Sequence, residues 1–202
     1  SACNCFRQSA LLSNPVGNRM HLFYCSDNET KGKLFYPDGT MKYQFIQDFD
    51  ERKDTVYYLC NFDSSGKISQ RGMVDFQNKK YNGEIKWFYP DSSLRKTGFL
   101  YDTIPKGIWK EYYPDGNIKE EYSFDKGLLN GTYKVYYPDG NIQTERYYNR
   151  GKLKNVFFCR DIHGKSINFG SFAGGNGTLK IFDEKGKIIM ETLYKDGLPV
   201  IR

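Results

Sequence analysis

Apolar and polar residues alternate along short segments of this chain, and clusters of turn-forming residues separate the segments. Segments rich in Tyr, Phe, Ile, Val and Thr flank Tyr-Pro-Asp-Gly and related turns, a pattern typical of β-hairpins. Because successive side chains of a strand point to opposite faces of a sheet, Trp109, Glu111 and Tyr113 share one face. Lys110 and Tyr112 lie on the other face. The pattern therefore predicts hairpins with two chemically different faces.

The hairpin pattern repeats along the chain. Three consecutive copies begin at Gly83, Gly107 and Gly131, which gives a period of 24 residues. A unit this short cannot bury its apolar side without a neighbour. The aligned turn positions indicate about seven units: Gly39, Gly66, Ser92, Gly116, Gly140, Gly164 and Gly186. The predicted fold class is all-β, with tandem β-hairpin repeats forming an elongated antiparallel meander sheet.

The register of each hairpin follows from its proline. A two-residue Asp-Gly turn would require a ladder hydrogen bond from Pro114, which has no N–H to donate. A four-residue loop over residues 114–117 avoids this and places Lys110 opposite Glu121. The same register forms further cross-strand pairs: Tyr113 with Ile118, Lys134 with Glu145, and Lys180 with Glu191. Opposite charges recur at the same place in each hairpin, so they specify the register.

This register divides the side chains between a core face and a more polar face. The predicted core face carries Trp109, Glu111, Tyr113, Ile118, Tyr122, Phe124, Tyr133, Val135, Tyr137, Ile142 and Tyr148. The opposite face carries Lys86, Lys110, Lys134 and Lys180 in one column and Phe88, Tyr112, Tyr136 and Phe182 in the next. Aromatic side chains can supply contact area and lysines can steer a partner. The predicted partner-binding residues, called here the lysine–aromatic surface, are Lys86, Phe88, Lys110, Tyr112, Lys134 and Tyr136. The alternative is that these side chains only shield a thin sheet and keep it soluble.

The N-terminal segment differs from the rest of the chain. Residues 1–30 lack the repeat and are predicted to form an irregular leader, whereas residues 31–202 form a single repeat domain. Ser1-Ala2-Cys3 matches the end of a bacterial lipoprotein signal, which makes Cys3 a candidate lipidation site and the leader a candidate tether. An exported envelope lipoprotein and a cytoplasmic protein are both compatible with the sequence. No hydrophobic stretch is long enough to span a bilayer, so membrane contact is expected only through such an anchor.

Candidate chemistry is sparse. The net charge of +6 arises from 30 basic and 24 acidic residues spread along the chain, and no nucleic-acid partner is expected. The five cysteines and two histidines lack metal-ligand spacing, and His21 and His163 have no catalytic partner in the sequence. The segment 170–177 lacks the features of a phosphate loop and is interpreted as a flexible connection or bulge. No catalytic residue, metal site or cofactor is predicted.

The segments Tyr-Tyr-Pro-Asp-Gly-Asn-Ile and Gly-x-Tyr/Trp-Lys resemble the bacterial variant of the MORN repeat family, most strongly over residues 83–151. Proteins of this kind are often labelled YwqK-type antitoxins. The resemblance implies hairpins laid side by side, an interaction scaffold and no family catalytic residues.

The leading functional hypothesis is a non-enzymatic protein-binding repeat scaffold, with an antitoxin or immunity-like protein that covers a toxin as its specific form. One alternative is a cell-envelope lipoprotein with a structural or self-assembly role. A second alternative is a module that binds anionic lipid through basic side chains.

Overall fold

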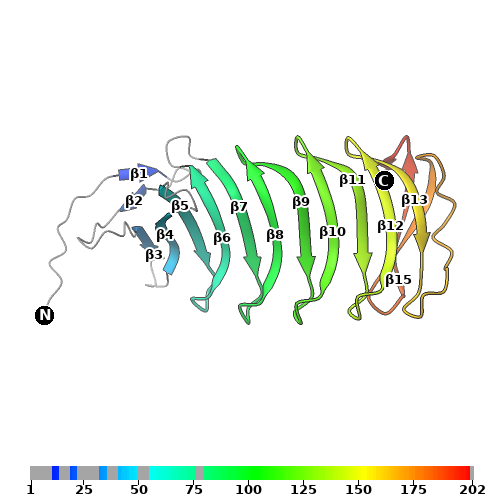
Figure 1. Ribbon diagram of the computed structural model, residues 1–202, viewed down its shortest axis with the longest axis horizontal. Coiled ribbons are helices and arrows are strands. Elements are labelled where there is room, and N and C mark those ends of the chain that lie inside the picture. Colours follow the sequence, from blue (N-terminus) through cyan, green and yellow to red (C-terminus); the bar gives the residue numbers. More distant parts are fainter. Residues whose placement is uncertain are drawn as a thin grey trace, which may run out of the picture. The chain divides into compact units, whose positions relative to one another are not determined.

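The computed structural model describes residues 11–13, 19–21, 32–35, 41–49, 55–75 and 80–200. These residues form strands, turns and irregular segments, with no helix among them. Strands β3 to β13 are hydrogen-bonded in chain order in one sheet, called here the first sheet, and β14, β15 and β16 form the second sheet (Figure 1). Strands β1 and β2 form a separate two-stranded sheet. The predicted all-β meander of consecutive antiparallel hairpins is confirmed.

The contacts within the chain define two compact units. The first comprises Ser1–Leu94 and Phe99–Thr103, and the second comprises Arg95–Gly98 and Ile104–Arg202. The strands of the first unit are β1 (Leu11–Ser13), β2 (Arg19–His21), β3 (Gly32–Phe35), β4 (Met41–Phe49), β5 (Thr55–Phe62), β6 (Ile68–Asp75) and β7 (Lys80–Phe88). Strand β8 (Leu94–Tyr101) contributes to both units. The strands of the second unit are β9 (Ile104–Tyr112), β10 (Ile118–Asp125), β11 (Leu128–Tyr136), β12 (Ile142–Asn149), β13 (Lys152–Cys159), β14 (Gly177–Phe182), β15 (Ile188–Lys195) and β16 (Leu198–Pro199).

The Pro-Asp-Gly loop is one residue shorter than predicted. The Tyr113 N–H donates to the Asn117 carbonyl at 2.8 Å, and the Gly116 N–H donates to the Tyr113 carbonyl at 2.9 Å. The loop is therefore Pro114, Asp115 and Gly116. A β-bulge between Ile118 and Glu120 then restores the expected alignment, so that Lys110 lies opposite Glu121.

The other charge pairs behave in the same way. Lys134 lies opposite Glu145, and Lys180 lies opposite Glu191, each following a bulge near its turn. The predicted charge register is confirmed, but the predicted pairing of Tyr113 with Ile118 is wrong. Ile118 instead faces Tyr112.

This shift moves two apolar residues to the other face of the sheet. Ile118 lies opposite Tyr112, and Ile142 lies opposite Tyr136. The prediction that Ile118 and Ile142 belong to the core face is therefore wrong. We call the face that carries Lys110, Glu121, Lys134 and Glu145 the lysine face, and the opposite face, with Trp109, Tyr122 and Tyr133, the tryptophan face.

Two-residue turns connect successive hairpins. Lys126 and Gly127 have φ values of 50° and 81°, the left-handed conformations that a type I′ turn requires at both central residues. The Gly127 N–H donates to the Pro105 carbonyl at 3.1 Å, and the Gly151 N–H of the next such turn donates to the Leu129 carbonyl at 2.7 Å. Each of these turns is thus hydrogen-bonded to the preceding repeat.

Aromatic rings fill the tryptophan face of the second unit. Trp109 and Tyr122 lie opposite each other on β9 and β10 and are only 4% and 6% exposed. The Tyr122 ring stacks on Tyr133 of β11, with centroids 5.0 Å apart and an angle of 9° between the planes. The prediction that Trp109 packs on the core face is confirmed.

A carboxylate is embedded beside these rings. Glu111 Oε1 accepts hydrogen bonds from the Tyr122 hydroxyl at 2.8 Å and from Lys96 Nζ at 2.9 Å. Burial alone raises the pKa of Glu111, but the hydrogen bonds from Lys96 and Tyr122 outweigh it and hold the pKa below the usual value. Because the pKa of Glu111 is lower in the folded chain than in the unfolded chain, the ionised carboxylate stabilises the fold at pH values above the unfolded-state pKa. This stabilisation is lost as the pH falls through the folded-state pKa.

We therefore expect Glu111→Gln to lower the free energy of unfolding at pH 7 by about 1 kcal/mol. The difference between the variant and the original chain should shrink as the pH falls below about 4.3, where the carboxylate of the unfolded chain is protonated. Urea unfolding at several pH values between 3 and 8 measures this. Glu191→Gln, at an exposed position of β15, is the control and should change stability much less. A difference for Glu111→Gln that persists at pH 3 would contradict the electrostatic explanation.

The first unit has its own small core. Phe45, Leu59 and Ile85 are 7%, 8% and 2% exposed. Leu59 and Ile85 both lie opposite Gly72 of the intervening strand β6. The Tyr81 ring approaches Gly72 so closely that a Cβ atom there would lie 2.8 Å from it. Glycine on β6 therefore leaves the space in which the ring packs.

The seventh hairpin does not continue the first sheet. The Ile167 N–H donates to Cys159 of β13, and the Lys180 N–H of β14 donates to Phe169, so residues 167–169 lead from one sheet to the other. Leu153, Val156 and Cys159 of β13 pack with Phe172 and Leu179 in one buried cluster. Figure 1 shows β15 passing behind β12 and β13.

The lysine and aromatic columns consequently end before β14. Lys180 and Phe182 lie in the second sheet, so the prediction that they extend these columns is wrong. The segment 170–177 connects the first sheet to β14, as the sequence predicts, with Ala173 and Asn176 forming an isolated bridge.

Candidate functional site

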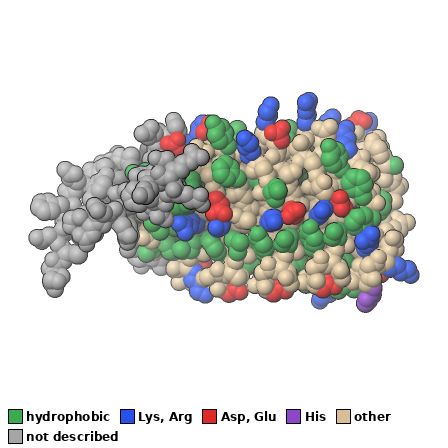
Figure 2. Space-filling model, viewed as in Figure 1, with side chains coloured by type: hydrophobic (Ala, Val, Ile, Leu, Met, Phe, Trp, Pro, Cys, Tyr) green, Lys and Arg blue, Asp and Glu red, His purple; other side chains and the backbone are tan. Residues whose placement is uncertain are grey.

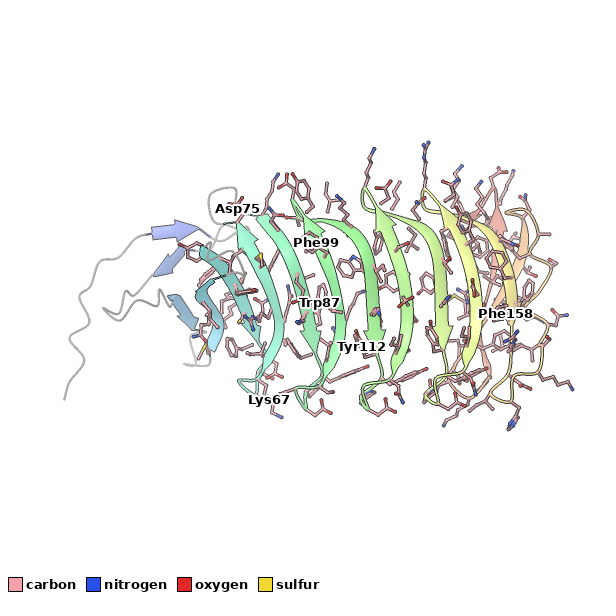
Figure 3. All side chains as sticks on the ribbon, viewed as in Figure 1. Lys67, Asp75, Trp87, Phe99, Tyr112 and Phe158 are labelled. Carbon is pink, nitrogen blue, oxygen red and sulfur yellow. The ribbon has the colours of Figure 1, made fainter. Side chains whose placement is uncertain are left out.

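The second unit brings four residues of the lysine–aromatic surface onto one face. Lys110 and Tyr112 of β9 and Lys134 and Tyr136 of β11 all lie on the lysine face, because each lysine is aligned with Glu121 of the intervening strand β10. All four side chains are half-buried. Tyr112 ends β9, next to the Pro114 turn (Figure 3).

A row of alternating charges crosses this face. Lys110, Glu121, Lys134 and Glu145 follow one another in register from β9 to β12. Lys110 Nζ lies 3.2 Å from Glu121 Oε2, and these side chains are 35% and 31% exposed. The lysines therefore do not form a positive ribbon. Positive and negative side chains alternate across the face, so their charges balance locally.

An apolar band runs beside the charge row. Its members are aromatic and aliphatic residues from the turn ends of the strands: Tyr112, Ile118, Tyr136 and Ile142. They are half-buried, so part of each side chain is accessible. Figure 2 shows a band of hydrophobic side chains next to a line of alternating basic and acidic groups over these strands.

Tyr136 connects the two features. Burial raises the pKa of its hydroxyl, and the nearby carboxylates of Glu121 and Glu145 raise it further, while Lys134 and Lys110 oppose the shift. The phenol thus lies within the field of all four charges of the row. It remains a neutral hydrogen-bonding group at neutral pH.

In the first unit, Lys86 and Phe88 occupy β7. Lys86 Nζ forms an ion pair with Glu84 Oε2 at 2.8 Å. With Tyr58 and Arg71, these charged side chains line a cavity of 200 Å³. The Arg71 guanidinium lies over the Tyr58 ring, 4.0 Å from its centroid. Lys86 is therefore also part of a mixed-charge environment.

The other residues considered in the sequence do not form a metal site or a reactive thiol in the described part of the chain. Cys3 lies outside the described residues. Among the residues that the structure describes, no three His, Cys, Asp or Glu side chains are grouped so that they could hold a metal ion. No helix in that part of the chain is long and apolar enough to cross a membrane. Cys60 and Cys159 are buried free thiols, and burial raises the pKa of both, which disfavours the reactive thiolate.

Sequence reasoning missed a polar group inside the fold. Gln143, Thr144 and Arg146 of β12 are 3%, 1% and 8% exposed. The alternation of β12 places Thr144 and Arg146 on the tryptophan face, opposite Val135 and Tyr133. No sequence signal indicates what covers them, because the covering hairpin lies about 40 residues further along the chain, as the hydrogen bond from Gln143 Nε2 to the Asp183 carbonyl illustrates.

These observations define a protein of tandem β-hairpin repeats whose chemistry lies in its surfaces. Three segments of the chain, 105–126, 129–150 and 176–196, match the family model for the MORN repeat variant. The matches include the two hairpins that carry the charge row and also the hairpin of the second sheet. Repeats of this family are generally binding or structural modules and not catalytic. No curated protein matches the chain.

Proposed function

We propose that this chain is a non-enzymatic scaffold that binds a protein partner through the lysine face of its second unit. The observation that carries the proposal is the charge row of Lys110, Glu121, Lys134 and Glu145 beside the apolar band of Tyr112, Ile118, Tyr136 and Ile142. Apolar and aromatic groups supply the contact area of protein interfaces. Alternating charges favour a partner with the complementary sequence of charges and disfavour a shifted docking position.

The charge balance favours a protein over other partners. Binding to anionic lipid or to nucleic acid depends on a net excess of Lys and Arg at the surface. Each lysine of the row faces a glutamate, so the local field that would attract a polyanion is largely cancelled. A protein surface, in contrast, can present both signs of charge at the required spacing.

The narrower forms of this hypothesis concern the identity of the partner. An antitoxin or immunity-like role would make the partner a toxin whose active surface is covered. An envelope lipoprotein would instead present this face to neighbouring proteins, with Cys3 carrying the lipid. Affinity purification of the tagged chain from its own cells, with mass spectrometry of both the partners and the N-terminal peptide, distinguishes the two forms.

The binding face is tested with Lys110→Glu combined with Tyr136→Ala. This variant places like charges opposite each other, at Glu121 and the former Lys110, and removes an aromatic ring from the apolar band, so we expect at least a tenfold loss of captured partner. Lys185→Glu with Ile162→Ala makes comparable changes at two exposed positions outside the charge row and the apolar band and is the control. Circular dichroism confirms that both variants fold.

Retention of the same partners by the first variant would contradict the proposed face. Flotation with vesicles of phosphatidylcholine, with and without phosphatidylglycerol, tests the lipid alternative. Binding that depends on phosphatidylglycerol and is lost in the first variant would indicate that the lysine face binds an anionic membrane and not a protein. Capture of a second copy of this chain would indicate self-assembly, which light scattering over a range of concentrations tests.

A further inference from the structure

A cavity lies on the opposite side of the second unit from the lysine face. Its volume is about 240 Å³, and its lining residues come from the tryptophan face of the first sheet and from the hairpin of β14 and β15. Apolar and aromatic side chains form much of its wall, namely Tyr133, Val135, Ile181, Phe182 and Ile189. This volume is suited to a ligand of about the size of a single amino acid.

Arg146 contributes a cation to the wall of this cavity. It lies opposite Tyr133 on β11 and Val156 on β13, and only 8% of its surface is exposed. Its Nε atom is buried without a hydrogen-bond partner. The two terminal nitrogens are not buried in this way, and the guanidinium lies over the Tyr133 ring, whose centroid is 5.8 Å from Cζ.

A guanidinium in this position requires an acceptor. Arginine stays protonated in proteins, so burial cannot be relieved by loss of its proton. A buried nitrogen such as Nε that is left without a hydrogen-bond acceptor lowers the stability of the fold. The arrangement of Arg146 therefore points to an acceptor that enters the cavity from outside the chain.

The neighbouring carboxylates already have other partners. Glu120 accepts a hydrogen bond from the Tyr133 hydroxyl. Asp183 Oδ1 accepts hydrogen bonds from the backbone N–H groups of Lys185 and Lys187 at 2.9 and 2.8 Å, which fix this carboxylate within the turn. Glu120 and Asp183 thus have partners other than Arg146, and with Glu184 they limit how much negative charge a ligand can bring.

The charges of the wall select the class of ligand. Lys119 and Arg146 contribute two positive charges, and Glu120, Asp183 and Glu184 contribute three negative charges. These carboxylates would repel a phosphate or another polyanion more strongly than a ligand with one negative charge. A single carboxylate can instead accept two parallel hydrogen bonds from a guanidinium. We propose that the cavity binds a small monocarboxylate with an aliphatic or aromatic body, whose carboxylate pairs with Arg146 and whose body contacts the apolar wall.

The test uses 3-phenylpropanoate as the probe and the full chain as the protein. Isothermal titration and saturation-transfer NMR measure its affinity, together with that of 3-phenylpropanamide, which has the same body without the charge, and of inorganic phosphate. We expect the carboxylate to bind at least ten times more tightly than either of these. Arg146→Met, which keeps a long side chain but removes the charge, should weaken carboxylate binding at least tenfold.

Arg160→Met is the matched control. Arg160 is exposed and its guanidinium lies 4.3 Å from the centroid of the Phe158 ring, and it does not line the cavity. This variant removes the same charge and should leave binding of the carboxylate unchanged. Equal affinity of the acid and the amide, equal affinity in Arg146→Met, or no binding of 3-phenylpropanoate at 10 mM would each overturn the proposal.

Thermal unfolding without any ligand separates a binding role from a structural role. Because Arg146→Met removes a buried nitrogen that has no hydrogen-bond partner, its melting temperature should equal or exceed that of the original chain. Added 3-phenylpropanoate should raise the melting temperature of the original chain only. If Arg146→Met fails to fold, the comparison of acid with amide in the original chain still decides the proposal. Partner capture through the lysine face is a separate measurement and can fail independently.

Discussion

Replacing Gly98 with alanine is expected to lower the free energy of unfolding by about 3 kcal/mol, at the upper end for overpacking in a core. A Cβ atom at Gly98 would lie 2.2, 2.3 and 2.6 Å from three ring carbons of Trp109. The Trp109 ring is 4% exposed and contacts Phe124 edge to face at 5.7 Å, so it cannot shift without disturbing the aromatic row. Urea unfolding followed by tryptophan fluorescence measures the change, and the melting temperature should fall by about 6–12 °C.

A double-mutant cycle identifies the cause of this effect. In a Trp109→Leu background the large ring is absent, so the further change Gly98→Ala should cost less than about 1 kcal/mol. An undiminished effect in that background would show that the loss does not arise from contact with the ring. Gly98 lacks a positive φ, so alanine is compatible with its backbone conformation and the cycle reports packing.

The sheet could be predicted from the sequence because opposite charges recur at a fixed distance from each turn. The pairs Lys110–Glu121 and Lys134–Glu145 specify the alignment of β9 to β12 without any knowledge of tertiary structure. They do not specify the loop. The strands are aligned in the same way beyond the bulge whether the loop has four residues or has three residues followed by a bulge. The charge pairs therefore could not reveal that Ile118 lies on the lysine face.

That error changes the interpretation of the lysine face. The sequence predicts a more polar surface with a column of aromatic residues, whereas Ile118 and Ile142 complete an apolar band with Tyr112 and Tyr136. The predicted residues Lys110 and Lys134 are in register, but each lies beside glutamates. Alternation alone places Lys110, Tyr112, Lys134 and Tyr136 on one face of the second unit, while the apolar composition of that face depends on the bulge.

The departure of the last hairpin could not be predicted from its own sequence. It has the same kind of charge pair, Lys180 with Glu191, and a turn with the same hydrogen bonds, from Asp183 to Lys187 and from Gly186 to Asp183. The difference lies in the preceding connection. At Gly170, φ is 110° and a Cβ atom would lie 2.3 Å from the Thr178 carbonyl oxygen, so the chain bends back tightly onto the start of β14.

The cavity around Arg146 results from this bend and cannot be predicted from local sequence patterns. Arg146 occupies a position that the alternation of β12 assigns to the tryptophan face, where a solvated arginine would be unremarkable. It becomes buried only because the hairpin of β14 and β15 covers that face. A contact between segments so distant in sequence depends on tertiary packing, which neither the repeat period nor residue propensities encode.

Docking of that hairpin should depend strongly on Leu179. Its side chain is 0% exposed and belongs to the cluster with Leu153, Val156 and Phe172. We expect Leu179→Ala to lower the free energy of unfolding by about 3–4 kcal/mol, because the truncation removes buried apolar surface and leaves a cavity. Leu193→Ala is the control, since Leu193 of β15 is 43% exposed, and it should cost less than about 1 kcal/mol.

Hydrogen exchange shows where the stability is lost. The Leu153 N–H donates to the Gly197 carbonyl at 2.9 Å, and the Lys180 N–H donates to the Phe169 carbonyl at 2.8 Å, so both amides report the junction of the two sheets. In Leu179→Ala their protection should fall, while amides of β9 and β10 keep theirs. Because the same hairpin forms one wall of the Arg146 cavity, this variant should also weaken binding of 3-phenylpropanoate. Uniform loss of protection along the chain would instead mean that the repeats unfold as one cooperative unit, with the hairpin as an integral part of it.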